Sequence, residues 1–178
     1  MKKIYLVPIG EIDKTLLEKL KDPLQERFKL NVEISPSLPI DEGTYNSWRN
    51  QYLATPILYQ LKKNIQPDAK RTLGIIDKDL YTYGLNFIFG QADLGGKLCL
   101  ISITRLRESY YGKSEDEKLF FQRVLKEAVH ELGHTFGLRH CDNPKCVMHF
   151  SNSLPETDIK GTDFCRKHQL ELEKNLIY

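Results

Sequence analysis

One stretch, HELGHTFGLRHCDNPKC at residues 130–146, most constrains what this chain can fold into. It holds three of the five histidines and two of the four cysteines, and His140 and Cys141 are direct neighbours. Histidine and cysteine gathered at this density are typical of metal ligands. The stretch therefore raises the question of whether it builds one metal site or two sites that share a border.

The residues before this stretch predict the helix that carries it. Residues 114–117, SEDE, fit a capping box with Ser114 as N-cap and Glu117 reaching back. At about 100° per residue, the apolar positions of LFFQRVLKEAVHELGHTF gather on one side, and His130 and His134 fall on the opposite side. We expect the apolar back to pack on a sheet. Two polar residues share the histidine side, Arg123 and Glu127.

The spacing within the stretch suits one metal ion. His130 and His134 are one helical turn apart, so both imidazoles can reach the same tetrahedral ion. Glu131 lies off their line, where a carboxylate can miss the metal and still reach a water. Gly137 can adopt the left-handed conformation that ends a helix, which returns His140 as a third ligand. Three ligands leave a fourth position open, as a catalytic zinc requires. The alternative is that the histidines are ordinary surface or core residues.

The cysteines predict a second cluster. Cys141 and Cys146, followed later by Cys165 and His168, have the pairwise spacing of a structural zinc site with three cysteines and one histidine. Four protein ligands leave no open position, so this ion should do no chemistry. The alternative is that they are unpaired core cysteines, which is our interpretation of Cys99 in the apolar run KLCLISI.

Upstream of the helix, strand and helix signals alternate, which predicts an α/β fold with a mostly parallel sheet. The LGG sequence at 94–96 indicates a tight turn that makes one of the last two strands antiparallel to its neighbour. Two helices are expected at 15–30 and 45–64, with Pro56 as a kink or restart in the second. The strands are expected at 3–9, 31–34, 71–77, 86–93 and 97–104.

Composition excludes several classes of partner. The 26 basic and 24 acidic side chains give a formal net charge of +2, which does not indicate a nucleic-acid or membrane partner. No apolar run approaches the length of a bilayer span. The N-terminal MKKIYLVPIGEIDK is typical of a first strand and not of a signal peptide. We expect a cytoplasmic monomer.

These residues together resemble a known family. The pattern H-E-x-x-H-x-x-G-x-x-H followed by a methionine is typical of metzincin metallopeptidases. With Cys141 after the third histidine, Cys-x4-Cys, Val-Met and a late cysteine, the chain resembles the archaemetzincins. The segments YNSWRNQY, GLNFIFGQADLGG and HFSNS extend the resemblance over most of the chain.

The resemblance implies a metzincin-like α/β fold (α+β by some schemes). Its sheet would be mixed, mostly parallel, five-stranded and twisted, with one antiparallel edge strand, and would pack on an active-site helix. A small zinc-stabilised C-terminal subdomain would end in a helix. We expect one catalytic domain over residues 1–178, with subdomains at 1–137 and 138–178.

The resemblance also implies a zinc metallopeptidase that hydrolyses peptide bonds in a peptide or protein substrate and binds two zinc ions per chain. Glu131 would be the general base and acid that activates a zinc-bound water, and Met148 would be the Met-turn residue. The catalytic zinc ligands would be His130, His134 and His140. The structural zinc ligands would be Cys141, Cys146 and Cys165, with His168 where the family has a cysteine.

Substrate placement would fall to the strand edge at 86–93, because an exposed edge can add an extended peptide as another strand. The candidate residues are Asn86, Phe87, Phe89 and Gly90, the glycine allowing close backbone approach. The alternative is an ordinary sheet strand. Three aromatics either line the cleft or pack in the core, namely Tyr81, Tyr83 and Phe150. Two other functions stay open: a zinc-stabilised peptide- or protein-binding module with little hydrolytic activity, and a zinc hydrolase of a non-peptide amide.

Overall fold

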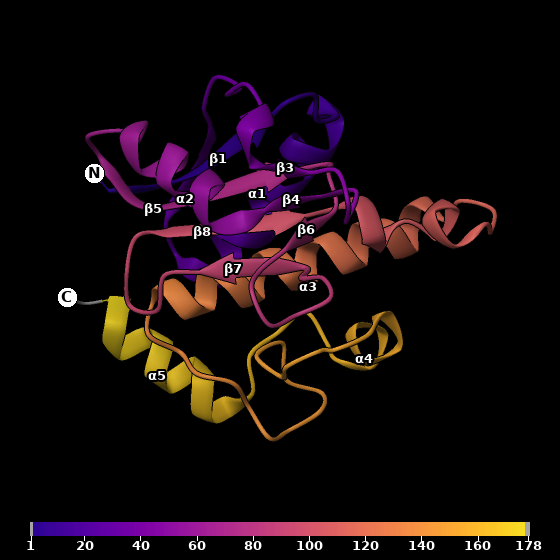
Figure 1. Cartoon of the computed structure of the whole chain (residues 1–178). Helices are drawn as coiled ribbons and strands as arrows, with labels where there is room; N and C mark the ends of the chain where they lie inside the picture. The colour runs from indigo at the N-terminus through magenta and orange to yellow at the C-terminus, as the bar shows by residue number, and fades with distance from the viewer. Residues whose placement is uncertain (1, 177–178) are drawn as a thin grey trace.

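The computed structural model describes residues 2–176 and is built around a five-stranded sheet (Figure 1). The strand order is β2-β1-β5-β8-β7. Four strands run parallel, and β7 pairs antiparallel with β8 at the edge. The expected mostly parallel sheet with one antiparallel edge strand is confirmed. The strands are β1 (Lys3–Ile9), β2 (Asn31–Ile34), β5 (Ala69–Ile76), β7 (Gly90–Ala92) and β8 (Leu98–Ser102).

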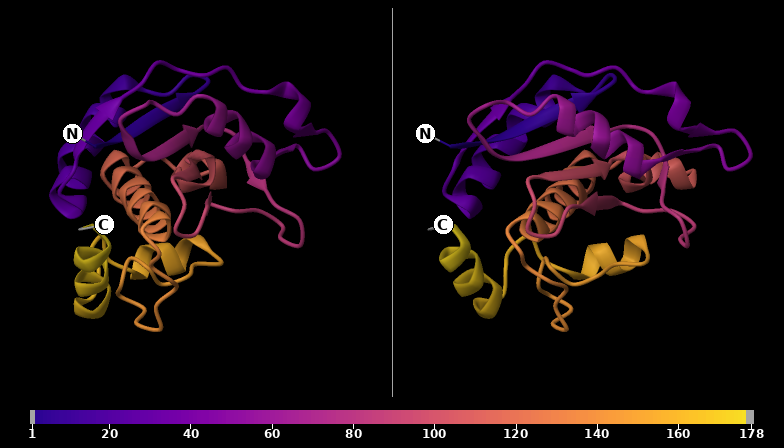
Figure 2. Two further views of the ribbon diagram at one scale, coloured as in Figure 1. Left: turned by 90° about the vertical axis from the view of Figure 1, so that its left-hand side faces the viewer. Right: turned by 60° about the vertical axis from the view of Figure 1, so that its left-hand side comes forward.

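Helices cover both faces of this sheet. The alternation of side chains along β8 shows how: Cys99 and Ile101 belong to the core with α1 (Lys14–Phe28) and α3 (Glu117–Thr135), whereas Leu98 and Leu100 belong to the core with α2 (Ala54–Lys63). A parallel sheet buried on both faces is the usual arrangement. Figure 2 shows α3 lying between the sheet and the C-terminal segment.

The C-terminal segment carries α4 (Leu154–Ile159) and α5 (Arg166–Leu176), so the expected terminal helix is confirmed. A distant residue of α1 ties this segment to the rest of the molecule. The Arg27 guanidinium donates to the Thr162 carbonyl and hydroxyl at 2.9 and 3.0 Å and lies 2.8 Å from the Asp163 carboxylate. Among residues 2–176, no helix has the length and apolar character needed to span a bilayer.

The predicted helix at 45–64 is wrong in its first half. Tyr45–Asn46 forms β3 and Gln51–Leu53 forms β4, and only Ala54–Lys63 is helical. β3 and β4 pair antiparallel, and β6 (Leu80–Tyr81) pairs parallel with β4, which makes a second sheet of three short strands. This small sheet shares a core with α2.

A local turn explains the error. The side-chain oxygen of Asn46 accepts hydrogen bonds from the backbone N–H groups of Trp48 and Arg49, which replaces helical bonding by a turn. Asn50 follows with a positive φ of 52°. Pro56 then lies in the first turn of α2, where its missing N–H leaves no helical bond unmade.

Two further expectations are corrected. The N-cap of α3 is Asp116, whose side chain accepts from the Leu119 N–H, and not Ser114. The strand expected at 86–93 is ordered as a strand only at Gly90–Ala92, with Ile88 in an isolated bridge. Within residues 2–176 there are also three short 3-10 turns, η1 (Glu42–Thr44), η2 (Thr104–Leu106) and η3 (Glu108–Tyr111).

Candidate active site

Three histidines converge at the C-terminal end of α3. His130 and His134 lie one turn apart on the helix, and Gly137 has the left-handed φ of 88° that turns the chain back. His140 is thereby returned to the same place. One ligand atom from each ring lies within 4.8 Å of the others, so the structure brings together the three residues that the spacing singled out.

Hydrogen bonds fix which ring nitrogen faces the cluster. The Nδ1 atoms of His130 and His134 lie 2.8 and 2.7 Å from the carbonyls of Val147 and Leu138. A carbonyl only accepts, so each Nδ1 carries a proton and each Nε2 bears a lone pair. The two Nε2 atoms are 3.1 Å apart, close to the ~3.3 Å between two nitrogens on one tetrahedral zinc. Lone pairs facing each other repel unless a cation lies between them, so these residues fit a zinc ion.

The surroundings keep the imidazoles neutral. Burial lowers the pKa of His130 well below its ordinary value, and the nearby Lys160 charge adds to the effect. Burial also lowers the pKa of His134 to about 4. Zinc binds neutral imidazole, so the rings are ready to coordinate near pH 7 without first losing a proton.

Glu131 lies buried beside this cluster. Burial, and to a smaller extent the charge of Glu127 one turn earlier, raises the pKa of its carboxyl to about 8, against the opposing charge of Lys160. A cation among the histidines would favour the ionised form. A carboxylate in this place can exchange a proton with a molecule at the histidine cluster.

Close approach of β7 explains why Gly90 stands opposite Glu131. A Cβ added at Gly90 would lie 2.6 Å from Cγ and Oε1 of Glu131, so only glycine leaves room for this carboxylate. The sequence motivated Gly90 by substrate approach, whereas in the structure its neighbour is Glu131. The following hairpin is tied to α3 by the Gly95 N–H, which donates to the His134 carbonyl at 2.9 Å.

Two cavities flank Glu131. A narrow one of about 70 Å³ lies on the side of Glu127, and a wider, more open one of about 550 Å³ lies on the side of His134 and His140. The first is lined by Phe87, Ile88, Phe89, Gly90, Glu127, His130, Glu131, Phe150, Ser151, Asn152 and Lys160. The second is lined by Gly90, Gln91, Ala92, Leu94, His130, Glu131, His134, Arg139, His140 and Phe150.

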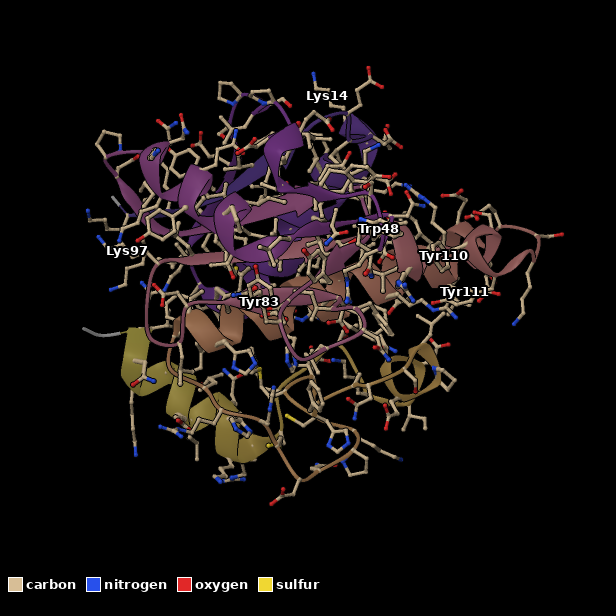
Figure 3. The ribbon with its side chains drawn as sticks, in the orientation of Figure 1. Lys14, Trp48, Tyr83, Lys97, Tyr110 and Tyr111 are labelled. Atoms are coloured by element: carbon tan, nitrogen blue, oxygen red, sulfur yellow. The ribbon has the colours of Figure 1, made fainter. Side chains whose placement is uncertain are left out.

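The expected substrate-binding and aromatic residues divide between these cavities and other places. Phe87, Phe89 and Gly90 line the narrow cavity, whereas Asn86 lines neither and offers its carbonyl to Arg49 and Gln51. Phe150 lines both cavities and its ring centroid lies 4.9 Å from that of His140. The other two aromatics lie elsewhere, Tyr81 in the core and Tyr83 on the exposed surface (Figure 3).

The second cluster is also assembled. The sulfurs of Cys141 and Cys165 are 3.8 Å apart, and Nδ1 of His168 lies 3.3 Å from the Cys165 sulfur and 3.8 Å from that of Cys146. Two thiolates on one tetrahedral zinc are ~3.8 Å apart. Although burial opposes it, hydrogen bonds from the backbone and ring of His168 lower the pKa of the Cys165 thiol to about 6. These four donors fit a closed zinc site.

The backbone between the clusters is held from two directions. The Cys141 N–H donates to the Met148 carbonyl at 3.0 Å, and the Cys141 carbonyl accepts from Nδ1 of His149 at 2.7 Å. Met148 is fully buried against α3, where a Cβ added at Gly133 would lie 2.5 Å from its sulfur. Hydrogen bonds thus fix the backbone conformation where the two clusters meet, between His140 and Cys141.

Sequence reasoning missed the charged partners beneath the cleft. Arg123 and Glu127 were expected on the histidine side of α3, and both are buried there beside Asp158 and Lys160 of the C-terminal segment. Arg123 pairs with both oxygens of Asp158 at 2.7 Å, and Nζ of Lys160 lies 3.1 Å from Glu127. Charges four residues apart on one helix face were the available signal for Glu127, and nothing local marked Lys160.

Residues 5–174 match Peptidase family M54. The chain belongs to this family. It is 45% identical to the archaemetzincin of Pyrococcus furiosus over 97% of this chain and 93% of that protein. The crystal structure of the archaemetzincin from Methanopyrus kandleri aligns with a TM-score of 0.87 and 35% identity, covering 99% of this chain and 97% of that one.

A second archaemetzincin structure agrees. That of Archaeoglobus fulgidus, complexed with malonate, is 40% identical with a TM-score of 0.81 and covers 95% of this chain and 99% of that one. As an archaemetzincin, the chain is a zinc-dependent metallopeptidase, and peptides or proteins are its class of substrate. Its cluster of three histidines and its cluster of three cysteines with one histidine are consistent with one catalytic and one structural zinc ion.

Proposed function

We propose that this archaemetzincin cleaves peptide bonds in the cleft between β7 and α3, with Glu131 as the residue that moves the proton. The observation that carries the proposal is a buried carboxylate, Glu131, set beside three converging imidazoles. A base, a Lewis-acid site and an adjoining open cavity together suit hydrolysis.

In this proposal, His130, His134 and His140 hold the catalytic zinc. When bound, zinc makes water more acidic and polarises the carbonyl of the bond to be cleaved. Neutral imidazoles leave the double charge of the ion undiminished. The carbonyls of Val147 and Leu138 orient two of the rings, which is the supporting role that outer hydrogen bonds play at such centres.

Glu131 accepts the proton of the attacking water on a carboxylate oxygen and returns it to the leaving amine nitrogen. Gly90 leaves the space that this carboxylate occupies. Burial between α3 and β7 keeps bulk water from competing for the proton. Glu131 therefore carries the proton, and Gly90 contributes by leaving room for the Glu131 carboxylate.

An extended peptide adds to the outer edge of β7, because β7 ends the sheet and pairs on one side only with β8. Phe87, Phe89 and Gly90 form the wall beside it. Asn86 precedes this wall and is anchored through its backbone carbonyl by Arg49.

The second zinc is structural in this proposal and is held by Cys141, Cys146, Cys165 and His168. Met148 supports α3 at the turn between the two histidines of the helix. Because Cys141 follows His140 directly, holding one side chain fixes the backbone that delivers the other. The closed site thereby positions the third ligand of the open one.

A library of quenched fluorescent peptides tests the proposal, with zinc-loaded wild type and Glu131→Gln compared side by side. Cleavage by wild type alone supports a peptidase. No cleavage by either protein, with two zinc ions bound to each, favours the zinc-stabilised binding module. Hydrolysis of simple amides without any peptide favours the non-peptide hydrolase.

We further propose one catalytic domain over 1–178, with parts 1–137 and 138–178, acting as a cytoplasmic monomer. Both parts line the cavities, which supports a single functional unit. Three of the four cysteines group with His168 and Cys99 is buried alone, which suits a reducing compartment. Sedimentation velocity and cell fractionation check these two statements.

A further inference from the structure

The loop at residues 82–89 joins β6 to β7 and leads the chain to the cleft (Figure 1). Side chains of the hairpin of β3 and β4 hold its second half. The Arg49 guanidinium donates to the carbonyls of Leu85 and Asn86, both at 3.0 Å. The Gln51 amide donates to the same Asn86 carbonyl at 2.9 Å. The small sheet therefore fixes the backbone of a loop that ends in the cleft.

One carboxylate connects these bonds to a second support. Asp79 accepts from the Gln51 amide at 3.1 Å and from two nitrogens of Arg105 at 2.7 and 2.8 Å. The Arg105 guanidinium lies over the ring of Phe87, with 4.1 Å between Cζ and the ring centroid. A planar guanidinium that is paired on two nitrogens has a fixed orientation, and its stacking on an aromatic face is attractive. Phe87 is thus held through its ring as well as through the backbone before it.

The loop ends at residues that face Glu131. Phe87 lines the same cavity as Glu131, and its ring centroid is 5.1 Å from that of Phe89. Gly90 follows as the first residue of β7, the strand to whose outer edge a substrate peptide is proposed to add. Binding and catalytic groups must be held to within about 0.5 Å of the productive geometry. A support of Phe87 is therefore also a support of the bound substrate.

A second triplet of the same kind supplies a comparison. Asp77 accepts from Arg107 at 2.8 Å, and the Arg107 guanidinium lies 4.3 Å from the ring centroid of Phe120. Phe120 lies in the first turn of α3, about 15 Å along the helix axis from His130 at 1.5 Å per residue. It is not among the residues that line either cavity. The same three residue types therefore support the core in one triplet and the cleft in the other, which is centred on Asp79.

We propose that Asp79 and Arg105 are positioning residues of the peptidase, which hold Phe87 and the start of β7 where the substrate binds. They act through Phe87 and not on the reacting atoms. Their loss should therefore weaken substrate binding and leave proton transfer by Glu131 nearly unchanged once the substrate is bound. The inference rests on the proposed function, because it takes the substrate to lie along β7 beside Glu131.

Asp79→Asn removes the charge and keeps the size of the side chain, and Asp77→Asn makes the same change in the comparison triplet. The substrate is the quenched peptide that the wild type cleaves fastest. Asp79→Asn should raise KM by about fivefold, the worth of one hydrogen bond or cation–π contact, and leave kcat nearly unchanged. Asp77→Asn should keep both constants, even where the two variants lose a similar amount of melting temperature. An equal rise of KM in both variants would indicate general loosening and overturn the inference.

A double-mutant cycle tests whether Arg105 acts through Phe87. Arg105→Met removes the guanidinium and keeps a long side chain, and Phe87→Leu removes the ring. The KM of the double variant should be close to the larger of the two single values, because each change removes the same contact. Arg107→Met combined with Phe87→Leu is the control, and its two effects on KM should multiply. Multiplied effects of Arg105→Met and Phe87→Leu would contradict the proposal.

Two further readouts do not need turnover. Fluorescence anisotropy of labelled peptides with zinc-loaded Glu131→Gln should show weaker binding when Asp79→Asn is added and equal binding when Asp77→Asn is added. Hydrogen exchange of the free proteins should become faster across residues 82–89 in Asp79→Asn and not in Asp77→Asn. Unchanged exchange in Asp79→Asn would overturn the inference.

These readouts separate the two proposals. If the wild type cleaves no peptide while Asp79→Asn still weakens peptide binding, the peptidase proposal fails and the positioning role stands. If the wild type cleaves peptides and Asp79→Asn behaves like Asp77→Asn, the positioning role alone fails. If no peptide is cleaved or bound, both proposals fail.

Discussion

The two donor clusters share one short stretch of chain yet differ in how completely protein surrounds them. Three imidazoles form the first, and it opens on a cavity of about 550 Å³. Three thiols and an imidazole form the second, with Cys146 and His168 buried. The number of protein ligands, three or four, separates a site that can admit a reactant from one that can only hold the fold.

Ligand charge deepens this difference. Neutral imidazoles leave a divalent ion strongly positive, whereas three thiolates more than cancel its charge. An ion held by three imidazoles can polarise a substrate, whereas an ion held by three thiolates and a histidine stabilises the local backbone fold. Four substitutions test whether chemistry and stability divide between the clusters in this way.

The largest effect is expected from Glu131→Gln, which removes the proton acceptor and keeps the shape of the side chain. kcat/KM should fall by about 10² to 10⁴, while elemental analysis still finds two zinc ions. Glu18→Gln on the exposed face of α1 is the control. Undiminished turnover would remove Glu131 from the mechanism.

His168→Ala removes a ligand of the closed cluster only. We expect zinc content to drop from two ions toward one, the melting temperature to fall, and the remaining site to bind zinc about tenfold more weakly, as when a supporting group is lost. His168→Cys restores a fourth ligand and should recover both. Unchanged zinc affinity and activity in His168→Ala would show that the clusters are independent.

Gly90→Ala probes the open cluster from the sheet side. The new methyl would collide with Glu131, so kcat should fall by about tenfold or more through misplacement of the carboxylate. Zinc content and melting temperature should change little, because no ligand is touched. Full activity in this variant would show that β7 can move away from α3 without consequence.

The smallest effect is expected at the shared border. His149→Ala removes the hydrogen bond to the Cys141 carbonyl and should weaken zinc binding at both clusters by about fivefold in a chelator competition. His149→Asn, whose amide can donate from nearly the place of Nδ1, should retain most of the affinity. A loss of zinc affinity at one cluster alone would show that the backbone at His140 and Cys141 does not couple the two clusters.

The sequence predicted most of the open cluster, because its ligands are placed by helical periodicity and one glycine turn, both of which are local. His130, His134 and Gly137 needed no knowledge of the rest of the chain. The order of the strands in the main sheet was not predicted, since periodicity cannot say which strands are neighbours.

What was missed depends on distant contacts. The face of α3 that holds Arg123 and Glu127 looks exposed from the helix alone, and contacts from distant segments bury it, among them Glu108, Asp158 and Lys160. The Lys160 ion pair joins two segments far apart in the chain and leaves no local pattern. The turn at Asn46 has a local cause, the asparagine side chain, but the prediction of one helix over 45–64 overlooked it.

The bond between Arg27 and Thr162 also has a consequence for timing. During synthesis, Thr162 follows Arg27 by 135 residues, so this hydrogen bond can form only after nearly the whole chain has left the ribosome. Contacts so far apart form late in folding. Both cavities need Phe150, and one needs Lys160. The walls of the cleft are therefore complete only after these C-terminal residues have been synthesised and have folded back onto α3.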